Sequence, residues 1–90
     1  MSRAERIEAA VRQALSPEAV EVIDESHLHA GHAGARPDGE THYRVRVVAA
    51  AFEGLSRVQR QRLINEAVKA EFDSGLHALA LETRSPAETS

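Results

Sequence analysis

The chain has 90 residues, enough for one small domain, and 42% of them are apolar while only 3% are aromatic, so its core must be aliphatic. Its 11 basic and 14 acidic side chains give a net charge of −3, which argues against general affinity for nucleic acids. The chain has no cysteine, which excludes disulfides and thiolate ligands of its own, and no run approaches the length of a membrane span. We therefore expect cytoplasmic residence in a bacterium, no membrane association, and a monomer or weak dimer when free.

The first expected element is a helix that begins after Ser2. Ser2 and Glu5 match a capping box, and the apolar residues that follow recur at every fourth position, at Ile7, Val11 and Leu15. Pro17 ends this helix, because the residue before a proline is pushed out of helical geometry. β-Branched residues then predict a strand over residues 19–26.

A long loop and a second strand follow. Residues 27–40 contain three glycines and a proline without apolar periodicity, so they predict a loop. Residues 41–50 alternate between apolar and polar side chains, the pattern of a strand that packs on one side only. The apolar set is Tyr43, Val45 and Val47, and the opposite set is His42, Arg44 and Arg46. We expect the two strands to form an antiparallel hairpin.

A second helix and a last strand complete the chain. Ser56 and Gln59 form another capping box, and Gly75 is a natural terminator. The residues expected to share the apolar sector of this helix are Val58, Ile64, Val68 and Phe72, together with Gln61. The segment LHALALE predicts the final strand, and residues 85–90 read as a disordered tail. The predicted domain, residues 1–84, is therefore α+β with the order α-β-β-α-β, a three-stranded mixed sheet and both helices on one face.

Three histidines, His27, His29 and His32, lie close together in the loop segment DESHLHAGHAG. Neutral imidazole is a common ligand of transition metals, but histidines in a glycine-rich loop are also ordinary solvated residues. A mononuclear zinc site is one alternative, yet the third imidazole need not converge with the other two, and a fourth ligand would have to come from His42 or Glu40. His77, at the start of the last strand, is either a structural residue or a further ligand.

Two other local patterns do not predict a functional site. The segment GHAG matches the G-x-x-G loop of KH modules, but here it joins two strands instead of two helices, so we interpret it as a coincidence. Ser26 near His29 lacks an identifiable oxyanion hole or orienting group, so we expect no enzymatic activity.

A mild basic region spans residues 41–72, which hold six basic and three acidic side chains. Its arginines are either a solvated surface, or contacts for phosphates, for an acidic partner or for glutathione carboxylates. The candidate contact residues are Arg44, Arg46, Arg57, Arg60 and Arg62.

Four segments in order, DESHLHAGH, ETHYRVRVV, FEGLSRVQRQRLIN and GLHALAL, resemble the BolA family over residues 5–84. The resemblance implies a fold similar to class II KH domains. Two departures are visible: Arg60, Gln61 and Arg62 stand where the family usually has Arg-His-Arg, and SPAETS replaces a Thr-Pro-x-x-Trp-like end.

The resemblance also implies partnership with a monothiol glutaredoxin and a shared [2Fe-2S] cluster, in iron-sulfur trafficking or iron sensing. The matching ligand positions are His77 and His29, and His27 or His32 are substitutes for the latter. Imidazole replaces thiolate on one iron in Rieske-type centres, so the thiolates would come from the glutaredoxin and its glutathione. The alternative function is a DNA-binding transcriptional regulator that uses the basic second helix.

Overall fold

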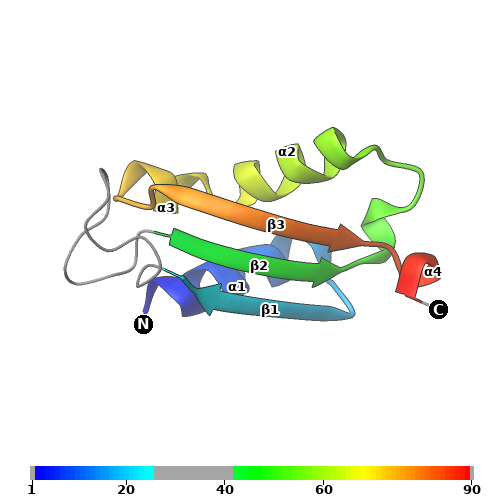
Figure 1. The fold of residues 1–90 in the computed structure, drawn as a ribbon, viewed down its shortest axis with the longest axis horizontal. Coiled ribbons are helices and arrows are strands. Elements are labelled where there is room, and N and C mark those ends of the chain that lie inside the picture. Colours follow the sequence, from blue (N-terminus) through cyan, green and yellow to red (C-terminus); the bar gives the residue numbers. More distant parts are fainter. Residues whose placement is uncertain (1, 26–41, 90) are drawn as a thin grey trace.

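The computed structural model describes residues 2–25 and 42–89 (Figure 1). Its elements are α1 (Arg3–Leu15), β1 (Ala19–Asp24), β2 (His42–Val48), the 3-10 helix η2 (Ala50–Phe52), α2 (Arg57–Ala67), α3 (Lys69–Asp73), β3 (Ala78–Arg84) and α4 (Pro86–Thr89). Within those two ranges, none of the helices combines the length and the apolar character needed to span a lipid bilayer.

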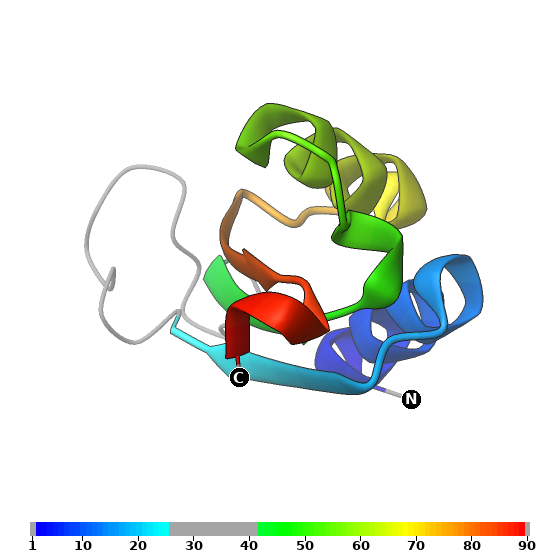
Figure 2. The same ribbon diagram turned by 90° about the vertical axis from the view of Figure 1, so that its right-hand side faces the viewer.

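The three strands form one sheet in the order β1-β2-β3. β1 pairs antiparallel with β2, and β2 pairs parallel with β3, so the sheet is mixed as predicted. α1 and α2 both cover the same face, and none of the helices in the described residues covers the opposite face, called the open face below (Figures 1 and 2). The side chains buried between the sheet and the helices include Ile7, Val11, Tyr43, Val45, Val47, Phe52, Ile64 and Val68. The aliphatic core and the helix placement predicted from the sequence are confirmed.

Both predicted capping boxes are present. The Ser2 hydroxyl accepts a hydrogen bond from the Glu5 N–H (3.2 Å), and the Glu5 carboxylate accepts one from the Ser2 N–H (3.2 Å). Ser56 and Gln59 exchange the same pair of bonds at the start of α2. α1 ends at Leu15, and Ser16, which precedes the proline, adopts the left-handed region with φ 46°. These local signals could be read from the sequence because each involves residues close together in the chain.

The predicted second helix differs from the observed one in two ways. It is divided into α2 and α3 at Val68, whose backbone (φ −105°, ψ 18°) leaves the helical region while its side chain stays buried. Val58, expected in the apolar sector, is 54% exposed. Arg60 faces inward at the start of α2 instead. Its side chain is only 11% exposed.

Arg60 can occupy this position because its guanidinium is hydrogen-bonded in place. It donates to the Leu55 carbonyl (3.2 Å), to the Thr83 carbonyl (3.2 Å) and to the Glu88 carboxylate (2.7 Å). The guanidinium carbon lies 5.6 Å from the centre of the Phe52 ring. A buried cation is tolerated where its donors are paired, so this arginine connects α2, β3 and α4.

The C-terminal segment also differs from the prediction of a disordered tail. Pro86–Thr89 form the helical turn α4, and the Glu88 carboxylate accepts a hydrogen bond from the Ser85 N–H (2.7 Å). This bond and the ion pair with Arg60 lower the pKa of Glu88 below its usual value. Ser85 belongs to the predicted tail, but Arg60 lies outside it and is brought to α4 by the tertiary fold.

An ion cluster joins the start of α1 to α3. Arg3 donates from Nη1 to the carboxylate (3.1 Å) and the carbonyl (2.9 Å) of Glu71, and to the Ser74 hydroxyl (3.0 Å). Arg6 donates from Nε to both carboxylate oxygens of Glu71 (3.1 and 3.0 Å). The side chains of Arg3 and Glu71 are 7% and 10% exposed, so this pairing is shielded from water.

We predict that Glu71→Ala lowers the free energy of unfolding by about 3–5 kcal/mol, because it leaves the Arg3 guanidinium buried without its counter-charge. Urea unfolding followed by circular dichroism measures the change. The matched control is Glu66→Ala on the exposed surface of α2, where a loss within about 0.5 kcal/mol is expected. Equal losses in the two variants would contradict the structural role of the cluster.

Candidate functional site

His77 lies in the short connection between α3 and β3, and its side chain is exposed. Gly75, with φ 126°, ends α3 as predicted, and the next residue, Leu76, is buried with its N–H donating to the Glu71 carbonyl (2.8 Å). The buried Leu76 and its hydrogen bond therefore fix the turn, and the next residue, His77, lies on the surface. Arg3 strengthens this anchor, because its guanidinium also donates to the Ser74 carbonyl (3.3 Å).

A second imidazole, that of His42, lies beside His77. His42 is the first residue of β2 and is 8% exposed. The parallel register pairs His42 with Ala78, the residue directly after His77. The two imidazole rings are 5.5 Å apart between centroids and are tilted by 47°. Residues that are 35 positions apart in the sequence thus meet at one end of the sheet.

The other predicted ligands, His27, His29 and His32, lie outside the described residues. The residues that flank their segment are described, however. The Glu25 N–H donates to the His42 carbonyl (2.8 Å), so the segment 26–41 leaves and rejoins the sheet at the same end where His77 stands. The topology therefore places the two residues that flank the histidine-containing segment, Glu25 and His42, at the end of the sheet where His77 lies.

Two imidazole groups are the candidate metal donors at this end of the sheet. In residues 2–25 and 42–89, no group of three or more His, Cys, Asp or Glu side chains is arranged to hold a metal ion. His77 and His42 are two adjacent imidazoles, and the chain has no cysteine to add. The described residues fit a role as nitrogen donors to a metal centre whose remaining ligands come from elsewhere.

Two of the predicted contact arginines form an ion-pair ladder on the open face of the sheet. Arg44 pairs with Glu25 (3.0 Å) and Glu82 (3.3 Å), and Arg46 pairs with Glu82 (3.1 Å) and Glu21 (3.0 Å). The ladder crosses all three strands. Its hydrogen bonds raise the pKa of both arginines and, chiefly through Arg46, lower the pKa of Glu82. Sequence reasoning missed these partners because they depend on the strand register.

The remaining predicted contact residues divide in a similar way. Arg60 is nearly buried and paired, as described above. Arg57 and Arg62 are exposed on α2, and neither forms an ion pair with any residue of the described ranges. Three of the five candidate arginines therefore already have carboxylate partners within the chain.

The lowered pKa of Glu82 predicts a pH dependence with a defined sign. A carboxylate with a depressed pKa in the folded state stabilises the fold above its usual pKa of 4.5, and this contribution is lost as the pH falls through the folded value. Between about pH 6 and about pH 3, the wild-type chain should lose more stability than the Glu82→Gln variant. Urea unfolding at both pH values tests this. An identical pH dependence in the two proteins would show that the ladder contributes nothing.

The topology and the position of the helices define a KH-like α+β fold. The family model described as BolA-like protein matches residues 11–88, and the chain therefore belongs to the BolA family. This confirms the resemblance found in the sequence.

Several relatives support the assignment. The chain is 53% identical over 98% of its length to an uncharacterized protein in the cobS 5′ region of Sinorhizobium sp, and it covers 96% of that protein. It is 48% identical over 91% of its length to BolA-like protein 1 of Homo sapiens, of which it spans 60%. It is 46% identical to SufE-like protein 1 of Arabidopsis thaliana over 97% of its length, but spans only 24% of that protein.

Solved structures agree with the fold. The BolA domain of SufE1 from Arabidopsis thaliana superposes with a TM-score of 0.88 at 45% identity, covering 98% of this chain and 96% of that one. BolA1 from the same plant gives the same TM-score, 0.88, at 34% identity, covering 100% and 99% of the two chains. The α+β architecture with a three-stranded mixed sheet is thus confirmed.

Proposed function

We propose that this chain is an adaptor that binds a monothiol glutaredoxin and supplies nitrogen ligands to a [2Fe-2S] cluster shared by the two proteins, in iron-sulfur trafficking or iron sensing. The observation that carries the proposal is the exposed imidazole of His77 at the sheet end where segment 26–41 is anchored. In this proposal His29 is the second ligand, with His27 and His32 as substitutes. The chain has no catalytic role.

The donor set supports a shared centre. A [2Fe-2S] cluster needs four outer ligands, and imidazole nitrogen replaces thiolate on one iron in Rieske-type centres. This chain has nitrogen donors and no cysteine, so the sulfur ligands belong to the glutaredoxin and its glutathione. When bound, the cluster would supply redox and iron-carrying chemistry that the chain lacks by itself.

The chain's own contribution is to hold the imidazoles in place. The Leu76 anchor and the Arg3–Glu71 pair fix the turn before His77, which reduces the ordering cost of binding. His42 packs beside His77 and limits the orientations that its ring can take. Positioning by neighbouring groups is a common way in which proteins tune metal ligands.

The DNA-binding alternative has less support from the described residues. Arg44, Arg46 and Arg60 are engaged by carboxylates of the same chain, so phosphate contacts would have to compete with these pairs. Arg57 and Arg62 alone would form a small patch on a chain of net charge −3. No contact in the described ranges favours this function over the adaptor.

We predict that His77→Ala abolishes the shared cluster. The variant, mixed with a monothiol glutaredoxin, iron, sulfide and glutathione, should give only the visible circular dichroism spectrum of the glutaredoxin homodimer. His77→Cys should restore a mixed cluster with a shifted spectrum, because a thiolate can replace the imidazole. Glu66→Ala, on the exposed surface of α2, serves as the control. An unchanged spectrum for His77→Ala would refute the ligand assignment.

His42 gives a second, independent prediction. If its role is to pack against His77, then His42→Phe keeps an aromatic ring at that place and should retain the mixed cluster. His42→Ala removes the ring and should lower the cluster occupancy at limiting iron, measured by visible absorption. Loss of the cluster in both variants, with both still folded by far-ultraviolet circular dichroism, would mean that a His42 nitrogen is itself needed.

A further inference from the structure

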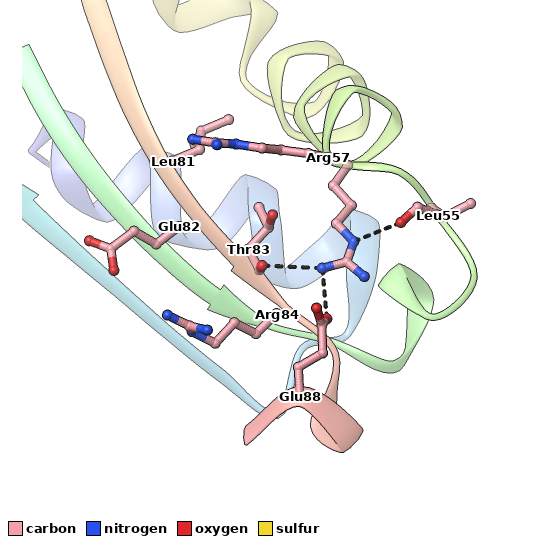
Figure 3. A pocket seen from close by; sticks show the side chains of 8 residues that line it. Leu55, Arg57, Leu81, Glu82, Thr83, Arg84 and Glu88 are labelled. Carbon is pink, nitrogen blue, oxygen red and sulfur yellow. Dashed lines mark hydrogen bonds and ion pairs between the residues drawn. The ribbon is translucent and has the colours of Figure 1, made fainter. Parts of the chain in front are cut away.

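A cleft of about 430 Å³ lies at the opposite end of β3 from His77 (Figure 3). It opens between the start of α2, the end of β3 and α4. Leu55 and Leu81 give it apolar walls, while Arg57, Arg60 and Arg84 give it cationic ones. β3 runs from Ala78 to Arg84 and lines the cleft from Leu81 onward, so the first three residues of the strand lie between the cleft and His77.

The charges that line the cleft are unevenly paired. Glu88 is neutralised by Arg60, and Glu82 accepts hydrogen bonds from Arg44 and Arg46 on the open face. Arg57 and Arg84 are exposed, and within residues 2–25 and 42–89 neither has a carboxylate partner. Two guanidinium groups at the cleft are therefore left without a counter-charge in the described part of the chain.

We propose that this cleft binds a small organic anion, with a phosphate or carboxylate head held by Arg57 and Arg84 and an apolar body against Leu55 and Leu81. Guanidinium groups offer paired donors that match the oxygens of either head group. The volume lies within the roughly 300–1,000 Å³ that is usual for small-molecule sites. Arg60 forms part of the wall, and its Nε and Nη1 groups already donate to Leu55, Thr83 and Glu88.

The same lining disfavours a nucleic acid as the occupant. Two acidic residues, Glu82 and Glu88, are among those that line the cleft, and a continuous phosphate backbone would have to pass them. A small anion needs to contact only the region between Arg57 and Arg84. Figure 3 shows Arg57 reaching from α2 toward β3, with Arg84 further along the same strand than Leu81.

The test is a titration of the full chain, followed by nuclear magnetic resonance, with three probes: inorganic phosphate, phenyl phosphate and benzoate. We expect phenyl phosphate to bind more tightly than inorganic phosphate, because its ring can contact the leucines. Binding of phenyl phosphate alone identifies a phosphate head, and binding of benzoate identifies a carboxylate head. Either result supports the proposal, whereas no saturable binding of the two aromatic probes overturns it.

Variants then locate the site. Arg57→Gln and Arg84→Gln should each weaken binding by at least about fivefold, the loss expected for one charge-assisted contact. Arg62→Gln, an exposed arginine of α2 outside the cleft, is the matched control and should change the affinity less than about twofold. Equal losses in all three variants would indicate diffuse charge attraction and overturn the proposal, as would tighter binding of a duplex DNA that competes with phenyl phosphate. His77→Ala should leave this binding unchanged, which separates this test from that of the shared cluster.

Discussion

The parallel pairing of β2 with β3 is the constraint on which the account of the site depends. Because His42 pairs with Ala78, the residue before Ala78 is carried to the edge of the same sheet end. A shift of one residue in this register would exchange the inward and outward side chains of β3 and separate the two imidazoles. The candidate ligands are thus placed by backbone hydrogen bonds between distant segments.

Two ion-pair systems support this arrangement from different sides. The ladder on the open face bridges β1, β2 and β3 through Glu82, and its geometry requires the same register that brings His42 and His77 together. Exposed pairs of this kind contribute little to stability individually. The pair of Arg3 and Glu71 is shielded from water, and together with the partly exposed Arg6 it ties the start of α1 to the turn before His77. The first turn of α1 therefore helps to fix the position of His77.

The sequence allowed the elements to be predicted where the signal is local. Capping boxes, the proline after α1 and the alternation in β2 depend on neighbouring residues, and the structure confirms them. The inward arginine of α2 could not be predicted, because Arg60 is accommodated by a carbonyl of β3 and a carboxylate of α4. The division of the helix at Val68 and the turn of α4 depend on tertiary contacts in the same way.

The candidate site could be predicted only in part, because the contacts that build it join segments that are distant in the sequence. His77 was identified through the family resemblance, but its exposure and its contact with His42 follow from the parallel register, which no local pattern specifies. The ion pairs of Arg44 and Arg46 were likewise invisible to a reading of charge along the chain. The roles of His27, His29 and His32 remain predictions, since these residues lie outside the described ranges.

The most direct measurement of the central claim is pulsed electron paramagnetic resonance of the reduced mixed cluster, assembled from unlabelled glutaredoxin and this chain carrying ¹⁵N-labelled histidine. The account predicts strongly coupled ¹⁵N nuclei on the cluster, because the imidazole nitrogens of this chain bind the iron directly. A spectrum in which the label produces no strong coupling would show that the chain supplies no ligand to the cluster.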